Sequence, residues 1–466
     1  MKKSFHLAVL AFSLTCIACS NTSGRNVLSE HASTDPEPNP TAPPSGNGVL
    51  NWGIQARNNY VLEDGNNVTC LYLRLKASED HEEHPHQPLN ISLVIDRSGS
   101  MAGAKMSYAR QAAKFVIDQL GPEDQLSIVN YDDRIEVTSP QQYVRNKEAL
   151  KRSVDRIMDR GSTNLMGGLQ EGYRQVQSMK REGYVNRVLL LTDGLANVGI
   201  TNPEEIRRIV SGKFRDQGIA LSTFGLGADY NEDLLTSMAE SGGANYYFIA
   251  EAANIPDIFH RELKGLLSIV ARDAVATINL PAGTICEGVS GYPYEVADGH
   301  ITIRFNDVFS GEEKGVLIRL KSNQLREGLN LNASLSYAIS GNSNKLHDYK
   351  ALHLPVTRNR QEYNASVNKE VEEKVAMFDA NDEFDAIMVE VDKGNYQEAQ
   401  RRAAGSISKL KEAQSATPSA ALKDREEQLS NYADGIGNME AMPAPAKSLQ
   451  QKAYKSINYE SRKLKR

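Results

Sequence analysis

Short apolar stretches alternate with amphipathic stretches through the middle of the chain, and this alternation restricts the possible folds more than any other feature. The expected strands cover residues 91–96, 125–131, 187–192, 220–225 and 245–249. The expected helices cover residues 106–120, 147–158, 165–179, 203–211, 232–240 and 255–269. Strands that alternate with helices form a mainly parallel sheet covered by helices on both faces. We therefore expect a doubly wound α/β domain, in which ligands bind beyond the carboxyl ends of the strands.

Oxygen-bearing side chains stand where these expected strands end. The first strand runs into Asp96, Ser98 and Ser100, Thr163 precedes a helix, and Asp193 follows a later strand. Two carboxylates and three hydroxyls, without His or Cys, suit Mg²⁺, Mn²⁺ or Ca²⁺ better than zinc or copper. The alternative is that both Asp residues only cap helices and that Thr163 ends a loop. Because all five residues fall at strand ends or in adjoining loops, we expect a divalent-cation site, with Mg²⁺ first and Mn²⁺ or Ca²⁺ as alternatives.

The pattern resembles the metal-ion-dependent adhesion site of von Willebrand factor type A (VWA) domains, over residues 89–270. The resemblance rests on an Asp-x-Ser-x-Ser motif that begins at Asp96, followed by Thr163 and Asp193 in the same order. It implies a Rossmann-like fold, direct coordination of the cation by both serines and Thr163, and water-mediated contacts from the two aspartates. It also implies an open coordination position that an acidic residue of a protein partner fills. Because the three hydroxyls carry no charge, the ion stays electron-poor and attracts a carboxylate.

The amino terminus resembles a bacterial lipoprotein signal. Two lysines precede an apolar run over residues 7–18, which is shorter than the roughly 20 residues that span a bilayer. We expect a signal peptide over residues 1–18, a lipidated Cys19, and a proline-rich segment over residues 19–48 that is either a stalk or a tail without spacer function. The resemblance implies a lipid-anchored protein of the cell envelope. It also implies the outer membrane, because Ser20 is not the aspartate of inner-membrane retention.

Further strand patterns lie on both sides of the α/β region. They cover residues 60–62, 68–75, 274–280, 300–305, 315–320, 329–339 and 349–356. Short strands with Gly, Asn and Ser turns, and without helices between them, are typical of an antiparallel sandwich. We expect N-terminal strands over residues 49–88, the VWA domain over residues 89–270 and a β-sandwich over residues 271–358. The α/β domain is then either inserted into the sandwich or flanked by it.

Cys70 and Cys286 lie on opposite sides of the α/β region and are the two cysteines outside the leader and its lipidation position. In an exported protein they either form a disulfide or remain two buried thiols. A disulfide would join both flanks into one β unit with the α/β domain inserted. Many bacterial lipoproteins of the VWA type resemble such an insertion, which favours the pairing.

Helical patterns replace strands toward the carboxyl terminus. They cover residues 367–378, 383–392, 396–414, 420–435 and 447–464, and predict a helical region over residues 359–466. Residues 369–393 carry nine acids and three lysines, whereas the last twenty residues carry seven bases and one acid. The basic tail either contacts an acidic surface such as anionic lipid or lies as a helix near the acidic segment, and we favour the second interpretation.

Composition and motifs argue against several functions. With 53 Lys and Arg against 59 Asp and Glu, the net charge is -6, which argues against nucleic acid as a partner. No phosphate loop, nucleophile elbow or dinucleotide fingerprint occurs in the sequence. His81 and His84 do not have the H-E-x-x-H spacing and Pro85 opposes a helix, so we interpret this segment as a polar linker rather than a zinc site. A metal hydrolase would need a general base, and the two candidate carboxylates are needed to hold the ion.

We therefore expect a binding protein and not an enzyme. In this hypothesis a cell-envelope lipoprotein captures an acidic residue of a protein partner through the cation of its VWA domain. The alternative is an envelope assembly or scaffold factor whose helical carboxyl-terminal region docks a complex, and whose metal site is structural. The two hypotheses differ in which part of the chain contacts the partner.

Overall fold

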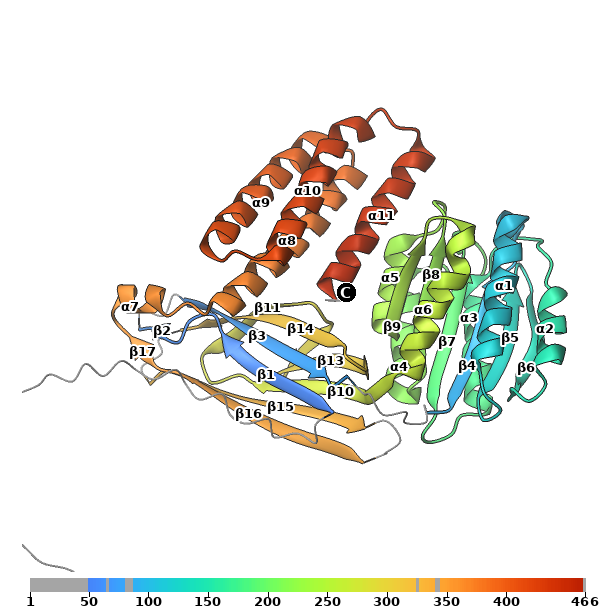
Figure 1. Cartoon of the computed structure of the whole chain (residues 1–466), viewed down its shortest axis with the longest axis horizontal. Helices are drawn as coiled ribbons and strands as arrows, with labels where there is room; N and C mark the ends of the chain where they lie inside the picture. The colour runs from blue at the N-terminus through green and yellow to red at the C-terminus, as the bar shows by residue number, and fades with distance from the viewer. Residues whose placement is uncertain (1–48, 64–66, 80–86, 324–326, 340–343, 464–466) are drawn as a thin grey trace, which may run out of the picture. The chain divides into compact units, whose positions relative to one another are not determined.

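The computed structural model describes residues 49–63, 67–79, 87–323, 327–339 and 344–463. The expected signal peptide, Cys19, the proline-rich segment up to residue 48 and the histidine-containing linker lie outside the described residues. Within those ranges, no helix combines the length and the apolar character that crossing a membrane requires. Their strands form two antiparallel sheets, one two-stranded pair and one six-stranded mixed sheet (Figure 1).

The six-stranded sheet has the order β6-β5-β4-β7-β8-β9. Its strands are β4 (Leu89–Asp96), β5 (Gln125–Tyr131), β6 (Ile135–Tyr143), β7 (Val185–Thr192), β8 (Ala220–Leu226) and β9 (Gly243–Ile249). Five strands are parallel, and β6 pairs antiparallel to β5 at one edge. Strand β6 is not predicted by the sequence pattern, because its alternating polar residues and Pro140 form an edge strand without an apolar run.

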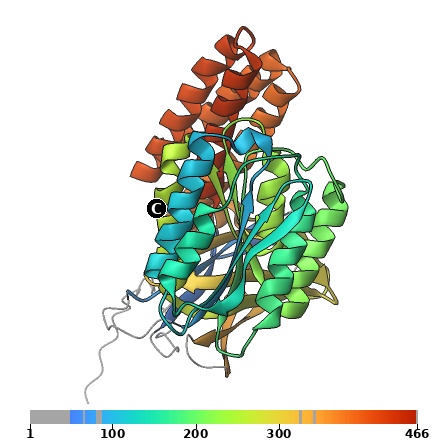
Figure 2. The same ribbon diagram turned by 90° about the vertical axis from the view of Figure 1, so that its right-hand side faces the viewer.

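Helices cover both faces of this sheet, as expected of a doubly wound fold (Figures 1 and 2). They are α1 (Ala104–Gln119), α2 (Lys147–Asp155), α3 (Leu165–Ser178), α4 (Pro203–Gln217), α5 (Glu232–Ser241) and α6 (Ile255–Leu267). Apolar residues of α1, α2 and α6 form one core against the sheet, and those of α3, α4 and α5 form a second core on the other face. Every residue of β4 is buried, because this central strand is covered on both sides.

Strands from both sides of the α/β domain form a β-sandwich. One sheet has the order β1-β3-β14-β11 and the other the order β12-β13-β10-β15-β16. Their strands are β1 (Leu50–Ala56), β3 (Asn67–Ala77), β10 (Ile269–Asn279), β11 (Thr284–Ser290), β12 (Tyr294–Ala297), β13 (His300–Phe309), β14 (Glu313–Ser322), β15 (Leu329–Ile339) and β16 (Lys345–Leu354). A parallel pair, β2 (Val61–Leu62) with β17 (Val356–Thr357), joins the same two flanks. Because β3 pairs with β14, which follows the α/β domain, that domain is inserted into the sandwich.

The sandwich keeps Cys70 and Cys286 apart, and both thiols are free. Cys70 on β3 lies opposite Arg319, and Cys286 on β11 lies opposite Leu320, so strand β14 runs between the two cysteines. Two strand spacings amount to about 9.5 Å, whereas a disulfide needs its Cα atoms within about 7 Å of each other. Of the two alternatives, the disulfide is therefore wrong, and strand pairing together with a shared apolar core joins the flanks.

Within the described residues, five helices follow the sandwich: α7 (Arg360–Ala365), α8 (Lys369–Asp392), α9 (Tyr396–Ala416), α10 (Ala420–Met439) and α11 (Ala444–Arg462). The sequence pattern predicted two helices where α8 is one, and this helix packs against the sheet that contains β3 and β14. Basic residues of α11 pair with acids of α8, since Lys455 lies 2.8 Å from Asp392 and Arg462 lies 3.1 Å from Asp385. The interpretation that the basic tail lies near the acidic segment is confirmed.

Helix α11 also covers the outer edge of the six-stranded sheet at β9. The Tyr246 backbone N–H donates to the Tyr459 hydroxyl at 3.3 Å, and the two rings meet edge to face with their centres 5.7 Å apart. Nearer the start of α11, the Lys452 ammonium donates to the Tyr230 carbonyl at 2.8 Å. Unpaired N–H groups of an edge strand can pair with other chains, and this helix removes part of that edge from solvent.

Replacing Tyr459 by Ala should destabilise the protein by about 3 kcal/mol, because the buried ring between α11 and β9 is lost. Ile457→Ala on the same helix is the matched control. Ile457 is 41% exposed, so its truncation should cost less than about 1 kcal/mol. Urea unfolding followed by circular dichroism gives both free energies. Equal losses in the two variants would contradict the role given to this contact.

The strand order also predicts that Cys70 and Cys286 stay reduced in protein prepared without reductant. Iodoacetamide added to the protein in guanidinium should alkylate both residues, because no disulfide joins them. Mass spectrometry of the digested protein measures the labelling. Recovery of a disulfide-linked peptide pair would contradict the placement of β14 between the two cysteines.

Candidate metal centre

The structure brings the five predicted ligands to the carboxyl edge of the six-stranded sheet. Asp96 is the last residue of β4, and Asp193 directly follows β7, the parallel neighbour of β4. Ser98 and Ser100 lie in the turn between β4 and α1, and Thr163 lies in the loop that leads into α3. Neighbouring parallel strands end side by side, so residues that are far apart in sequence meet there.

Hydrogen bonds connect four of these residues. Asp96 accepts from the Ser98 backbone N–H through Oδ1 at 2.8 Å, and from the Thr192 hydroxyl through Oδ2 at 2.7 Å. The Ser100 hydroxyl donates to Oδ1 of Asp193 at 2.7 Å. The hydroxyl oxygens of Ser98 and Ser100 are 3.1 Å apart. The two serines therefore link carboxylates that stand at the ends of different strands.

Thr163 faces the same space as Ser100. Its backbone is fixed by Asn197, which accepts from the Thr163 N–H at 3.0 Å through Oδ1 and donates its own N–H to the Thr163 carbonyl at 3.2 Å. A Cβ atom placed on Gly194 would lie 3.7 Å from the Thr163 hydroxyl oxygen and 3.8 Å from that of Ser100. Both hydroxyls therefore border the space beside Gly194, which a larger residue would fill.

A buried arginine outside the predicted ligand set ties the loops of the site together. Arg97 donates from Nε to Asp132 at 2.8 Å and from Nη1 to Glu136 at 2.6 Å. Arg160 donates to the same Asp132 oxygen at 2.7 Å, and its backbone N–H donates to the Arg97 carbonyl at 2.7 Å. Burial raises the pKa of Asp132, but hydrogen bonds from the Arg160 side chain and the Arg134 backbone, together with the charges of Arg97 and Arg160, outweigh it and hold the pKa below its usual range. Asp132 directly follows an expected strand, and that position was the available signal in the sequence.

Gly161 is a position where this framework requires glycine. Its φ is +74°, and a Cβ atom there would approach Oδ1 of Asp133 to 2.3 Å. The Gly161 carbonyl accepts from the Gly99 N–H at 3.1 Å. This bond joins the turn that carries both serines to the loop that carries Thr163.

A lysine that the motif does not include also touches the site. Lys105, in the first turn of α1, donates from Nζ to Oδ2 of Asp193 at 2.6 Å. Because Ser100 holds the other oxygen, both oxygens of Asp193 are engaged by groups of the protein. The sequence gives no signal for this contact, because it arises only when the turn after β4 folds back and α1 starts beside β7.

The five side chains fit a divalent cation. Burial raises the pKa of the Asp96 carboxyl to about 6, hydrogen bonds from Thr192 and Ser98 lower it, and the charge of Asp193 raises it again. A buried carboxylate in this state gains from a nearby positive charge, which would favour its ionised form. Carboxylate and hydroxyl oxygens are hard donors of the kind that Mg²⁺, Mn²⁺ and Ca²⁺ prefer.

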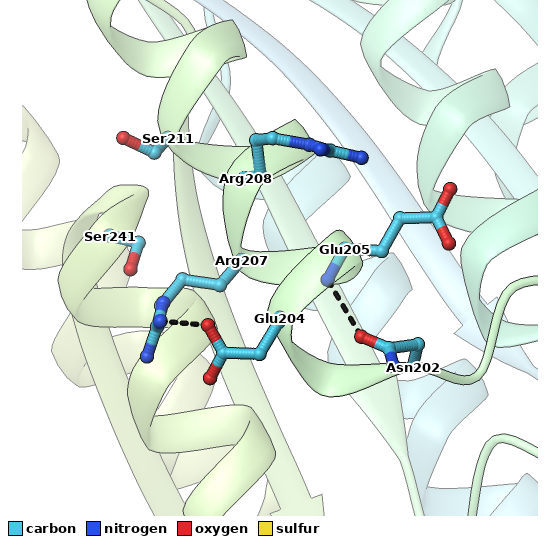
Figure 3. Close-up of a pocket in the computed structure, with 7 residues that line it drawn as sticks. All are labelled: Asn202, Glu204, Glu205, Arg207, Arg208, Ser211 and Ser241. Carbon is cyan, nitrogen blue, oxygen red and sulfur yellow. Dashed lines mark hydrogen bonds and ion pairs between the residues drawn. The ribbon is translucent and has the colours of Figure 1, made fainter.

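The described part of the chain has no group of three or more His, Cys, Asp or Glu side chains placed to hold a metal. A polar pocket of about 660 Å³ lies over α4, and Figure 3 shows the side chains that line it. There Glu204 pairs with Arg207, and Asn202 caps the helix by accepting from the Glu205 N–H at 3.0 Å. Glu204 and Asn202 are thus engaged within the helix, and Arg207 and Arg208 bring positive charge to the same pocket, so it suits a cation less well than the strand ends.

The α/β domain matches a known family. Residues 90–261 match the family model described as von Willebrand factor type A domain. The chain is similar to the uncharacterized protein YfbK of Escherichia coli (strain K12), with 31% identity over 212 residues, which are 45% of this chain and 37% of that protein. It is also similar to the uncharacterized protein sll0103 of Synechocystis sp., with 27% identity over 330 residues, 67% of this chain and 77% of that protein. The chain thus spans little more than a third of the first relative's length and about three quarters of the second's.

The fold extends the similarity beyond that domain. A solved von Willebrand factor type A structure from Catenulispora acidiphila matches 83% of this chain and 90% of its own, with a TM-score of 0.67 and 16% identity. At this identity the likeness concerns the fold. The inserted domain is VWA-like, and domains of this family are commonly metal-dependent protein-interaction domains.

In chelator, the Asp96 carboxyl should make the stability of the protein fall as the pH rises. The folded protein holds this proton with a pKa of about 6, against about 3.9 in an unfolded chain. Its stabilising contribution is therefore complete below about pH 4 and lost by the time the pH passes about 6. Asp96→Asn removes this titration and should be more stable than the wild type at pH 7.5, by roughly 1–3 kcal/mol.

In Mg²⁺ the wild type should become the more stable of the two proteins, because the cation binds to and stabilises its folded state. Asp96→Asn lacks one of the proposed ligand groups and should gain less stability from Mg²⁺. The effect of Mg²⁺ on the wild type should be larger at pH 7.5 than at pH 5, where the cation must displace a proton. Thermal unfolding of both proteins at the two pH values, in Mg²⁺ and in chelator, measures these differences in stability. A wild type that is the more stable protein in chelator at pH 7.5 would contradict the raised pKa.

Proposed function

We propose that the chain is a cell-envelope lipoprotein that binds a protein partner through a divalent cation, Mg²⁺ first, in its VWA-like domain. An acidic residue of the partner completes the coordination of the cation. The observation that carries this proposal is the exposure of one proposed ligand. Asp96, Ser98, Asp193 and Thr163 are buried, whereas Ser100 is exposed. A cation held by Ser100 could therefore be reached from solvent.

The proposed ligands divide into two kinds. Ser98, Ser100 and Thr163 would hold the cation directly, and Asp96 and Asp193 would act through water. The cation would supply a Lewis-acidic position that attracts a carboxylate. Because three of these five groups are neutral hydroxyls, a carboxylate of a partner gains more here than at a site already filled with carboxylates.

Exposed side chains around the site suit a macromolecular partner. Leu195, two residues after Asp193, is 54% exposed, and Ser162 is exposed directly before Thr163. Interfaces combine apolar contacts with a few polar anchors, and both are available here. A metal site that only stabilised the fold would be closed by its surroundings.

The envelope location in this proposal rests on the leader. A lipid on Cys19 would tether the protein to a membrane, and Ser20 in the following position points to the outer membrane. The net charge of -6 gives no support for a nucleic-acid partner.

A scaffold role for the helical region, with a structural metal site, has less support. Helix α11 would have to offer its basic side chains to an outside complex. Instead, Lys455 is paired with Asp392 and Arg462 with Asp385, so these charges are used within the protein.

We also propose a binding function over an enzymatic one. A metal hydrolase needs a group that can take a proton from water. Both oxygens of Asp96 and both oxygens of Asp193 already accept hydrogen bonds from the protein. The carboxylates of the site are thus committed to holding its structure and the cation.

A crosslinked pull-down from intact envelopes tests the proposed function. Capture of a partner by the wild type should require Mg²⁺ and should be lost in chelator. Thr163→Ala should lose capture in Mg²⁺, because a proposed direct ligand is removed. Ser162→Ala, which removes the neighbouring exposed hydroxyl, is the matched control and should capture normally.

Thermal unfolding in chelator shows whether Thr163→Ala is folded, and Asp96→Asn provides a second variant with a near-isosteric side chain. The proposal fails if the wild type and both site variants capture the same proteins to the same extent in Mg²⁺ and in chelator.

A further inference from the structure

We infer that Lys105 competes with the divalent cation for Asp193 and thereby sets how tightly the site binds metal. The inference rests on the metal site of the proposed function. It assigns to this lysine a role that is separate from those of the five ligands.

The contact between Lys105 and Asp193 is direct and partly shielded. The Lys105 Nζ atom lies 2.6 Å from Oδ2 of Asp193, whose side chain is fully buried, while the lysine side chain is 30% exposed. A charge-assisted hydrogen bond of this length to a buried carboxylate is among the stronger polar contacts of a protein. The ammonium group therefore already binds Oδ2 of Asp193, an oxygen that could otherwise accept from water bound to a cation.

The place of Lys105 on its helix argues that the lysine serves the site and not the helix. It lies in the first turn of α1, which has no acidic residue there. The amino terminus of a helix carries a partial positive charge, which favours acids and disfavours a lysine at this position. The unfavourable position is offset by the ion pair with Asp193, so local helix preference does not explain the residue.

The ion pair changes the charge that a cation meets. Asp96 and Asp193 contribute two negative charges when both are ionised, and Lys105 reduces the sum to one. The second cluster of charges, Arg97 and Arg160 on Asp132, makes no hydrogen bond or ion pair with Asp193 in the described structure. Lys105 is thus the cation placed to affect the site directly through Asp193.

The Lys105 ammonium group can also move away from Asp193. Its side chain is a flexible four-carbon stem whose ammonium group is strongly hydrated, and part of it already reaches solvent. A divalent cation that draws on Asp193 would displace the ammonium or be repelled by it. In both cases part of the binding free energy of the cation is offset by the lysine, so the site holds the metal more weakly than it would without Lys105.

Calorimetric titration of the folded chain with Mg²⁺, and with Mn²⁺ as a second probe, tests this inference. Lys105→Met should bind both cations about tenfold more tightly than the wild type, because a competing positive charge is removed. Lys105→Arg keeps the charge and should bind like the wild type. Lys114→Met is the matched control, since Lys114 lies on the same helix and pairs with Asp155 at 2.5 Å on the surface, and it should leave the affinity unchanged.

Lys105→Gln replaces Lys105→Met if the latter is not folded by circular dichroism, and should show the same increase. Unchanged or weaker cation binding in a folded Lys105→Met or Lys105→Gln would overturn the inference and leave the metal site standing. If neither the wild type nor these variants bind Mg²⁺ or Mn²⁺, the metal site itself fails, and the proposed function fails with it.

Discussion

Parallel pairing of β4 with β5 on one side and β7 on the other is the constraint on which the candidate site depends. It makes the three strands end at one edge, where Asp96, Asp132 and Asp193 follow in neighbouring positions. Three buried carboxylates at one edge repel one another and lose hydration. Hydroxyl, backbone N–H, guanidinium and ammonium donors near the strand ends offset this cost by donating hydrogen bonds to the carboxylates. The local structure of the edge is largely a consequence of that requirement.

The donors to Asp132 differ in kind from the donors to Asp96. Asp132 is held by Arg97 and Arg160, whose charges keep its pKa low and fix the loops that carry the ligands. Asp96 has only neutral donors, so burial keeps its pKa raised. Asp132 is therefore neutralised by two arginines of the chain, whereas Asp96 accepts its hydrogen bonds from neutral groups. A divalent cation bound as proposed would place a positive charge beside Asp96.

The rest of the protein holds this edge from other directions. The β-sandwich joins both ends of the inserted domain through the pairing of β3 with β14, without a disulfide. Helix α11 covers the sheet edge at β9 and satisfies the Tyr246 N–H with the hydroxyl of Tyr459. The site therefore lies on a domain whose chain ends and outer edge strand are both restrained by packing.

The strand–helix alternation of the α/β domain, the antiparallel flanks, the helical end and the position of the five oxygen-bearing side chains at strand ends followed from the sequence alone, because hydrophobic period and loop position are local properties. The edge strands β1, β6, β11 and β12 and the single helix α8 were missed, since edge strands with polar residues or glycine and long acidic helices lack a clear apolar period. Only the tertiary structure decided the rest. The strand order puts β14 between Cys70 and Cys286, and the fold of the β4–α1 turn brings Lys105 to Asp193. Contacts of this kind depend on which strands become neighbours, and that is settled by packing across the whole chain and not by any short stretch of it.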